Sequence, residues 1–528
     1  MENKLDLVSI CLSKTPMQES ILDNKVLGGI INAIPKIPFE ELKKKELYLK
    51  GQSSKIRVNK STGAEEDVNV KFEEQCVYIS KVLRYIAQSQ NSDFLILDAF
   101  LHFYNGAYWE KIEESMAMDC VALAGDMAGL LPVEASQEGN KKKLLKQFVS
   151  DYICPPPSAD DDLKILVNLK NGTLEYSGGG FNFRDFEKDD MLRHQLSYDF
   201  DPDALCPMFD VFLDEVLPEK AGQDALMEMI GYCFIPTKKL KLERSMMLFG
   251  EGANGKGVVF ELVKEILGHK HVSGFSMGAL SFDANTRAQL SGKLLNYSSE
   301  LGGKCNPDMI KKLISGEDVE VKTLYKDVWT MSDYTCKFMF NTNSLPKETE
   351  ANLAFFRRWI ILPFNVTIPK GKRDVKLSEK LKKELPGIFN RVIAGIKRLL
   401  ANEDFTESEL ARKTLEEYQV RSNTVLQFIQ DQGWIASVPP SNTERKSADN
   451  PHVTLAYLYK EYEKHCIENH NACASNRTFS ERIRKLFYVQ SSTGHANWVF
   501  CQKKEIEAVS APPDGLVYKT LEHLLKKD

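Results

Sequence analysis

Residues 245–257 of the chain read Ser-Met-Met-Leu-Phe-Gly-Glu-Gly-Ala-Asn-Gly-Lys-Gly. The first five residues form an apolar run of strand length, which leads directly into a glycine-rich turn. Gly250 and the pair Gly255-Lys256 have the spacing of a P-loop, in which backbone N–H groups surround polyphosphate oxygens and the lysine reaches the terminal phosphates. This stretch therefore predicts a nucleotide site inside an α/β fold.

The residues after the turn agree with this prediction. Residues 258–267 have apolar positions at helical spacing, so a helix would follow and add the partial positive charge of its N-terminus to the site. Gly257 departs from the pattern, because it stands where a serine or threonine hydroxyl would bind Mg²⁺. A glycine-rich turn without a ligand is the alternative. We expect ATP, accompanied by Mg²⁺, to be the ligand. The residues expected to bind the nucleotide are Gly250, Glu251, Gly252, Ala253, Asn254, Gly255, Lys256, Gly257 and Val258.

Hydrolysis also requires groups that orient water, sense the γ-phosphate and neutralise developing charge. Glu300 ends the strand-like run 293–300 and can orient the attacking water, bind Mg²⁺, or do both. Asn343 follows an apolar strand pattern and can hydrogen-bond the γ-phosphate. Arg357 and Arg358 precede another such pattern, and a planar guanidinium suits a phosphoryl transition state. An exposed acid or a salt-bridging arginine is the alternative interpretation of these residues.

A β-hairpin is predicted downstream of the acid by the alternation of Val319 and Val321. Its end offers lysines for phosphates and an aromatic ring for stacking on bases, which is what a single-stranded DNA track requires. The residues expected to bind DNA are Lys322, Tyr325 and Lys326. A solvated hairpin is the alternative.

Taken in order, these segments resemble superfamily 3 helicases, specifically the phage/plasmid and poxvirus-type primase-helicases. The pattern comprises G-x-x-x-N-G-K, strand-Ser-Glu, Lys-Leu-x-x-Gly-x-Asp, strand-Thr-Asn-x-x-Pro and Arg-Arg-x-x-x-x-Pro-Phe. Upstream segments such as Asn-Gly-Ala-Tyr-Trp at 105–109 are similar to the pre-helicase domain of that family. The resemblance covers residues from about 95 to about 500.

The resemblance implies an ATP-driven hexameric ring that translocates on single-stranded DNA, usually 3′ to 5′. Such a ring unwinds duplex DNA during replication of a phage, plasmid or mobile element, and its partners are single-stranded and forked DNA and further copies of the chain. Carried over by position, Lys256 contacts the phosphates, Glu300 is the Walker B acid, Asn343 is sensor 1, and Arg357 or Arg358 is the arginine finger.

Two features depart from that family. Ser299 stands where an aspartate would bind Mg²⁺ more strongly, and Gly257 has no hydroxyl, so we expect phosphates, water and Glu300 to hold Mg²⁺. Many members also carry a primase-polymerase domain, and the roughly 95 residues before the matching region are too few for one. We therefore expect a separate primase or polymerase as a partner.

The predicted fold is α/β. It comprises a P-loop, AAA+-like ATPase core with a central parallel sheet, a mostly helical N-terminal domain and a C-terminal winged-helix domain. The predicted divisions are a partly flexible N-terminal region at 1–94, a pre-helicase or collar domain at 95–235, the ATPase core at 236–404, a connector and winged helix at 405–505, and a C-terminal tail at 506–528.

Composition limits the remaining possibilities. The chain has 528 residues with 43% hydrophobic content, which fits several globular domains. We expect a cytoplasmic protein without a membrane partner, since the chain has no long apolar run and no secretory signal, and its cysteines form no C-x-x-C pair. The net charge of −5 excludes a uniformly basic coat but allows a lysine-lined channel. The basic run 141–146 is interpreted as a solvated helix face.

Two other functions remain open at this point. The chain could be an initiator that binds origin duplex and uses ATP only for assembly, without processive unwinding. It could also be an ATPase that senses nucleic acid in antiviral defence or its evasion. Fork unwinding separates the first hypothesis from the helicase.

Overall fold

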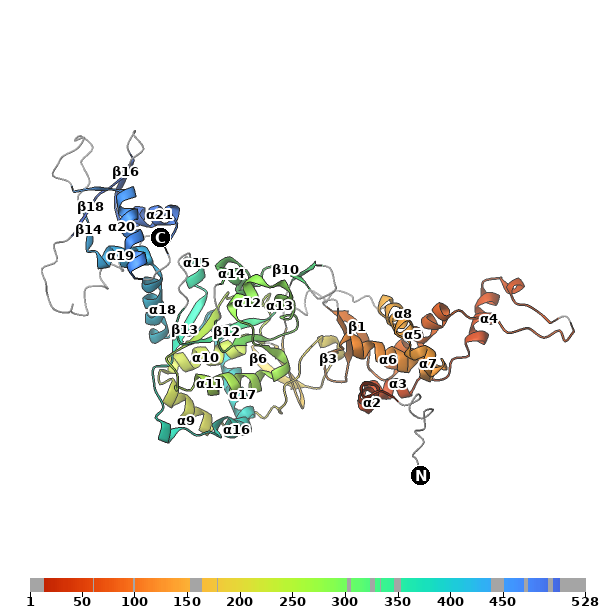
Figure 1. Cartoon of the computed structure of the whole chain (residues 1–528). Coiled ribbons are helices and arrows are strands. Elements are labelled where there is room, and N and C mark those ends of the chain that lie inside the picture. The colour runs from red at the N-terminus through yellow and green to blue at the C-terminus, as the bar shows by residue number, and fades with distance from the viewer. Residues whose placement is uncertain are drawn as a thin grey trace, which may run out of the picture. The chain divides into compact units, whose positions relative to one another are not determined.

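The computed structural model describes residues 14–59, 61–97, 100–151, 164–177, 179–301, 305–322, 328–332, 334–345, 353–437, 451–469, 473–491 and 497–503. The chain divides into two compact units. The first comprises Met1–Asn341 with Phe364–Ser408, and the second comprises Thr342–Pro363 with Glu409–Asp528. Figure 1 shows the elements of both units along the chain.

The N-terminal part of the first unit is mostly helical. Its elements are α2 (Pro16–Asp23), α3 (Leu27–Asn32), α4 (Phe39–Leu49), η1 (Ser53–Lys55), α5 (Phe72–Ser89), β1 (Phe94–Leu97), β2 (Phe100–Tyr104), β3 (Trp109–Lys111), α6 (Glu114–Ala128), α7 (Pro132–Ser136) and α8 (Glu138–Ser150). The three strands pair antiparallel in the order β1-β2-β3.

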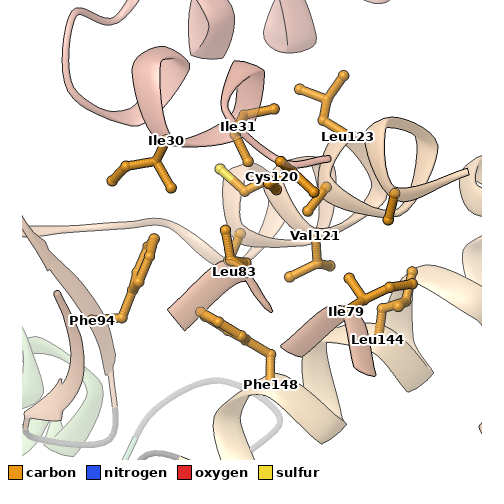
Figure 2. Packing of buried hydrophobic residues seen from close by; sticks show 14 of the residues in the cluster. Ile30, Ile31, Ile79, Leu83, Phe94, Cys120, Val121, Leu123, Leu144 and Phe148 are labelled. Atoms are coloured by element: carbon orange, nitrogen blue, oxygen red, sulfur yellow. The ribbon is translucent and has the colours of Figure 1, made fainter. Parts of the chain in front are cut away.

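One hydrophobic core joins these helices (Figure 2). On α5, Ile79 and Leu83 lie on one face because they are four residues apart, and both are buried. From α8, Phe148 meets Phe94 edge-on, with ring centroids 5.1 Å apart. Full burial of a side chain of this size contributes about 1.5–3 kcal/mol. The core therefore extends from α2 to α8 without a break in packing.

Three of the four lysines in the basic run on α8 pair with acidic neighbours. Lys141 pairs with Asp119 at 2.5 Å, and Lys143 pairs with Glu73 at 3.0 Å. Lys142 pairs with Glu138, one turn away, at 2.5 Å. These pairs confirm the interpretation of this run as a solvated helix face, because they leave little net positive charge for a phosphate backbone.

The chain then forms a second antiparallel sheet and two helices before the central sheet. The strands are β4 (Ile165–Leu169), β5 (Gly172–Ser177) and β6 (Gly180–Arg184), followed by η3 (Lys188–Asp190), α9 (Pro207–Val216) and α10 (Lys220–Tyr232). Asn168 donates a hydrogen bond through Nδ2 to the carbonyl of Ala107 at 2.8 Å, and the indole of Trp109 donates to the carbonyl of Lys188 at 3.0 Å. These bonds join the β2–β3 turn to this part of the unit.

The central sheet has five strands in the order β13-β7-β12-β9-β8. They are β7 (Ser245–Phe249), β8 (Val272–Ser273), β9 (Leu295–Ser298), β12 (Lys337–Thr342) and β13 (Trp359–Pro363). β9 runs parallel to both β8 and β12. All residues of β9 and β12 are buried, as expected for strands covered on both faces. This mixed α/β architecture with a parallel sheet agrees with the predicted class.

Helices lie between these strands in the chain and after the last of them. They are α11 (Lys256–Leu267), η4 (His269–His271), α12 (Met277–Phe282), α13 (Ala284–Ala288), α14 (Pro307–Ser315), α15 (Leu353–Phe356), η5 (Lys370–Lys372), α16 (Leu377–Leu381), η6 (Lys382–Glu384) and α17 (Leu385–Asn402). A separate two-stranded hairpin, β10 (Val319–Lys322) with β11 (Val328–Met331), follows α14.

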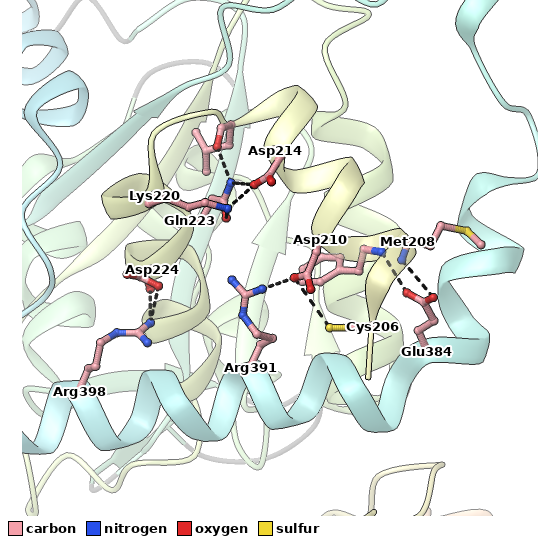
Figure 3. A network of polar contacts seen from close by, with 12 residues as sticks. Cys206, Met208, Asp210, Asp214, Lys220, Gln223, Asp224, Glu384, Arg391 and Arg398 are labelled. Carbon is pink, nitrogen blue, oxygen red and sulfur yellow. Dashed lines mark hydrogen bonds and ion pairs between the residues drawn. The ribbon is translucent and has the colours of Figure 1, made fainter. Parts of the chain in front are cut away.

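Glycines let α10 and α17 approach closely. A Cβ on Gly231 would lie 2.7 Å from Ile396 Cγ1, and one on Gly395 would lie 2.8 Å from the backbone of Met227. Ion pairs add to this contact (Figure 3). Arg398 pairs with Asp224 at 3.0 Å, and the side chain of Glu384 accepts hydrogen bonds from the first N–H groups of α9. These contacts hold α17 against α10 and the end of η6 against the start of α9.

The second unit contains a small helical and β-stranded domain. Its elements are α18 (Glu409–Ser422), α19 (Thr424–Asp431), β14 (Trp434–Ala436), β15 (Val453–Thr454), α20 (Leu455–Glu468), α21 (Asn476–Leu486), β16 (Val489–Ser491), β17 (Asn497–Val499) and β18 (Cys501–Lys503). The strands form a sheet in the order β15-β17-β16 and a pair β14-β18. Tyr462 of α20 stacks on Phe479 of α21, with centroids 4.9 Å apart, and so fixes the two helices together.

Candidate nucleotide site

The predicted P-loop has the strand-turn-helix form that its sequence requires. β7 ends at Phe249, the turn spans residues 250–255, and α11 begins at Lys256. Three residues of the turn have left-handed backbone conformations: Gly252 (φ +113°), Ala253 (φ +52°) and Gly255 (φ +89°). Such conformations curve the chain so that successive N–H groups can converge on an anion. The geometry of this turn suits a polyphosphate.

Two glycines of the turn are required by space. A Cβ on Gly250 would lie 2.3 Å from Asn254 Nδ2 and 2.5 Å from the carbonyl oxygen of Phe364. A Cβ on Gly255 would lie 2.6 Å from Val216 Cγ1 of α9. Gly257 differs, since a Cβ there would meet no atom within 4 Å. The absence of a hydroxyl at this position is therefore not imposed by packing.

Lys256 is buried in the turn that it is predicted to serve. Its side chain is only 6% exposed, and Nζ donates hydrogen bonds to the carbonyl of Gly250 at 2.5 Å and to Asn254 Oδ1 at 3.2 Å. Burial lowers the pKa of the Lys256 ammonium. Among the described residues Lys256 forms no ion pair with a carboxylate. A buried cation without a counter-charge is a favourable partner for phosphate oxygens.

A segment far away in the sequence holds the turn in place. In this segment, residues 364–368, the N–H of Phe364 donates to the carbonyl of Phe249 at 2.7 Å, and the N–H of Ile368 donates to the carbonyl of Ala253 at 2.8 Å. Asn254 Nδ2 donates to the carbonyl of Phe364 at 2.9 Å. The left-handed alanine is thus held by a tertiary hydrogen bond. This segment could not be predicted from the sequence, because nothing in local spacing links it to the P-loop.

Glu300 and Asn343 follow neighbouring parallel strands. β9 ends at Ser298, which is paired in register with Phe340 of β12. Glu300 and Asn343 are both exposed. Ser298 Oγ donates to the carbonyl of Glu300 at 2.7 Å, which fixes the backbone where the acid leaves the strand. The predicted roles of both side chains remain predictions.

Asn341, which lies within β12, has a different environment from Asn343, which follows that strand. Asn341 is buried, and its Oδ1 accepts a hydrogen bond from the hydroxyl of Tyr297 at 2.8 Å. This bond joins β12 to β9 inside the sheet. Strand periodicity alone does not separate this buried amide from the exposed Asn343, two residues later.

The arginine pair lies in the second unit, between α15 and β13. Arg357 is exposed, whereas Arg358 is 6% exposed. The two residues therefore differ in their access to a ligand, and which of them acts as a finger remains open.

The predicted hairpin is confirmed by the pairing of β10 with β11. Lys322 pairs in register with Val328, and Glu320 pairs with Thr330. Val319 and Val321 are buried, and Glu320 and Lys322 are exposed, as the alternation predicts. Of the residues expected to bind DNA, Lys322 lies at the end of β10, and Tyr325 and Lys326 lie outside the described residues.

No metal centre built from protein side chains occurs in the described ranges, where no three His, Cys, Asp or Glu residues gather as metal ligands. The predicted Mg²⁺ role of Glu300 thus depends on oxygens from a nucleotide and water. Of the helices that the structure describes, none has the length and apolar content that a membrane crossing requires.

Comparison with known proteins gives matches to two families. Residues 84–218 match a family described as D5 N terminal like, and residues 248–358 match a family of unknown function (DUF5906). The second match includes the P-loop, Glu300 and both arginines. Each match covers less than half of the chain.

Similarity to individual proteins is distant. A protein of Acanthamoeba polyphaga mimivirus named "Putative helicase L207/L206" is 22% identical over 237 residues, which are 42% of this chain and 24% of that protein. Two solved structures of the NrS-1 C-terminal region are also similar. The apo structure of residues 305–718 has a TM-score of 0.43 at 13% identity, covering 81% of this chain and 99% of that one. The A form apo structure has a TM-score of 0.44 at 10% identity, covering 81% and 100%.

The chain thus spans 24% of the length of the viral relative, so that the activity of the whole relative does not transfer to it directly. The chain thus shares partial similarity with the D5 N terminal like family and distant similarity with a viral protein that is named as a putative helicase.

Proposed function

We propose that this protein is an ATP-dependent DNA helicase of superfamily 3. In this proposal it forms a hexameric ring, moves 3′ to 5′ on single-stranded DNA, and unwinds duplex during replication of a phage, plasmid or mobile element. The observation that carries the proposal is Lys256, a buried ammonium without a carboxylate partner in the described part of the chain, at the start of a helix behind a P-loop turn. A phosphate-binding turn of this kind serves nucleotide hydrolysis in many motors.

The site residues have different roles in the proposed reaction. The backbone N–H groups of residues 250–258 and the Lys256 ammonium bind and orient the phosphates. Glu300 orients the attacking water and takes part in Mg²⁺ binding. Asn343 donates a hydrogen bond to the γ-phosphate or to that water, and Arg357 or Arg358 neutralises charge in the site of a neighbouring subunit. Mg²⁺, when bound with ATP, neutralises charge on the phosphate oxygens.

The DNA-binding parts of the proposal are the hairpin and the C-terminal domain. Lys322, Tyr325 and Lys326 contact single-stranded DNA in the ring. The C-terminal domain is proposed to be a winged helix, since α19, β15, α20 and α21 precede the β16–β17 hairpin and β17 pairs with both β15 and β16. A separate primase or polymerase supplies the primers, and the protein acts in the cytoplasm.

Single-strand-stimulated ATPase and fork-unwinding assays test the proposal. Wild type should show both activities, and Lys256→Ala should lose both because the phosphates lose their cation. Lys264→Ala is the matched control: this lysine also lies on α11, but it pairs with Glu261 at 3.8 Å, and its Nζ lies 4.9 Å from the ring centroid of Phe260. Full unwinding by Lys256→Ala would exclude this turn as the motor.

An initiator without processive unwinding is the second candidate. It is favoured by α21, where Arg477, Arg484 and Lys485 are exposed on a helix that follows another helix. Such a helix can enter a major groove. Tight binding to one duplex sequence, with no fork unwinding by wild type under any nucleotide condition, would select this candidate over the helicase.

A further inference from the structure

Arg287 of α13 is a buried arginine that bonds only to backbone carbonyls in the hydrogen bonds that the structure resolves. It is 8% exposed. Nη1 donates to the carbonyl of Leu280 at 3.0 Å and to that of Ser281 at 3.3 Å. Nε and Nη2 both donate to the carbonyl of Glu320 at 3.3 Å. The guanidinium therefore donates hydrogen bonds to two separate elements, through Nη1 to one and through Nε and Nη2 to the other.

The first of these elements is the C-terminal end of α12. Leu280 and Ser281 lie in its last turn, where helix carbonyls lack partners within the helix. A cation is stabilised at such an end. Ser281 Oγ also accepts a hydrogen bond from the N–H of Asn306, the cap residue of α14, at 2.9 Å. Arg287 thus completes the end of a short helix that is tied to its neighbours.

The second element is the β10–β11 hairpin, which is predicted to bind single-stranded DNA. Glu320 lies in β10, two residues before Lys322. In the described residues β10 pairs only with β11, and this two-stranded sheet is separate from the central sheet. Ladder hydrogen bonds therefore do not fix the hairpin to the motor core. Tertiary contacts hold it instead: the buried side chains of Val319 and Val321, and the hydrogen bonds from Arg287 to the carbonyl of Glu320.

The other end of α12 contacts the segment that follows the predicted catalytic acid. The N–H of Met277, the first residue of α12, donates to the carbonyl of Leu301 at 3.0 Å. Leu301 directly follows Glu300. One continuous set of contacts therefore leads from the residue after the predicted catalytic acid, through six residues of α12, to Arg287 and then to β10. Figure 1 shows α12, α13 and β10 in one group.

We propose that Arg287 is a positioning residue that couples the nucleotide site to the β10–β11 hairpin through α12, so that single-stranded DNA on the hairpin accelerates ATP hydrolysis. This inference rests on the proposed helicase function. The planar fork is essential to it, because one guanidinium reaches carbonyls on both sides, whereas a lysine ammonium is a point donor that can serve only one side well. Coupling then requires that Arg287 bonds to the carbonyls of α12 and to that of β10 at the same time.

The test compares Arg287→Lys and Arg287→Met with wild type. Nucleotide affinity and ATPase rate without DNA should stay within about twofold of wild type, whereas the oligo-dT-stimulated rate should fall about tenfold or more, as expected when a coupling contact shifts. Arg287→Lys keeps the charge and serves if Arg287→Met does not fold. Thermal unfolding measured on each variant shows whether the fold persists.

Arg398→Lys is the control for a general loss of stability. This arginine also bridges two elements, with Nε bonded to Glu228 at 2.8 Å and Nη2 to Asp224 at 3.0 Å, but both contacts are between α10 and α17. We expect a lowered Tm with an unchanged ratio of stimulated to basal ATPase. A folded Arg287→Lys protein with full DNA stimulation overturns the inference alone. A wild type that DNA does not stimulate overturns the proposed function and the inference together.

Discussion

Asn254 donates a hydrogen bond through Nδ2 to the carbonyl of Phe364, 2.9 Å away and 110 residues later in the chain. Its other side-chain atom, Oδ1, accepts from Lys256 Nζ at 3.2 Å. One buried amide therefore holds both the predicted phosphate-binding lysine and the 364–368 segment. The P-loop in this protein is fixed by a tertiary contact as well as by its glycines.

Replacing Asn254 by alanine should lower both stability and nucleotide affinity. The change leaves a buried carbonyl and a buried ammonium each without one partner, which costs about 1–3 kcal/mol in the free energy of unfolding. Urea denaturation and titration with an ATP analogue measure the two effects. Asn469→Ala, which removes an exposed side chain that bonds to the carbonyl of His465, is the control and should change little. Wild-type nucleotide affinity in folded Asn254→Ala would contradict this role.

Gly250→Ala should prevent nucleotide binding. Its new Cβ would lie 2.5 Å from the carbonyl oxygen of Phe364, and a backbone atom cannot move aside as a flexible side-chain end can. Gly257→Ala is the matched control, since it adds the same methyl group within the same motif where no atom lies within 4 Å. Isothermal titration with an ATP analogue should show loss of binding in the first variant only. Equal binding by both variants would show that the turn adapts.

Features that depend on local spacing could be predicted from the sequence, whereas features that depend on long-range contacts could not. The strand, turn and helix at residues 245–267 could be predicted because apolar spacing and glycine positions are local properties. The hairpin at Val319 and Val321 could be predicted for the same reason. The partners of Asn254 and Arg287 could not, because they depend on which distant backbone carbonyls the fold brings within hydrogen-bond distance. Glu300 and Asn343 are intermediate: their strands could be predicted, but not the exposure of the side chains.

Glu300→Gln should separate nucleotide binding from hydrolysis. The amide keeps the size of the side chain but cannot orient water as a carboxylate does, so turnover of ATP should fall about a hundredfold or more. Affinity for an ATP analogue should be retained, since Lys256 and the turn remain. Glu261→Gln on α11 is the control and should hydrolyse ATP normally. Wild-type turnover by Glu300→Gln would assign the catalytic acid to another residue.

Gly257→Ser should strengthen Mg²⁺ binding. It adds a hydroxyl at the position after the lysine, where the surrounding space is open and where α11 is in its first turn. Replacing glycine within a helix also stabilises the helix by up to about 1 kcal/mol. We expect the Mg²⁺ concentration for half-maximal ATPase to fall relative to wild type, with Gly257→Ala as the control for the helix effect alone. An unchanged Mg²⁺ requirement would place the ion away from this residue.

Acid should destabilise the first unit through His194. This side chain is 8% exposed, its Nε2 has no hydrogen-bond partner in the described structure, and its ring lies 5.8 Å from that of His271. Burial lowers the pKa of His194 to about 3, and the neighbouring His271 and Arg193 oppose its protonation further. Burial likewise lowers the pKa of His271 to about 4, and the charge of Lys293 contributes to this lowering.

The sign of the effect follows from these pKa values. In the unfolded chain His194 binds a proton as the pH falls through its ordinary pKa of 6.5, whereas in the folded protein it does so only near pH 3. The contribution of neutral His194 to the free energy of unfolding is therefore fully present above pH 6.5 and is lost as the pH falls from 6.5 toward 3. The loss from His194 reaches about 2 kcal/mol by about pH 5. His194→Phe should flatten this part of the curve in urea denaturation measured at each pH. His452→Gln, at an exposed histidine of the second unit, should keep the slope, and an unchanged slope in His194→Phe would assign the acid sensitivity to other groups.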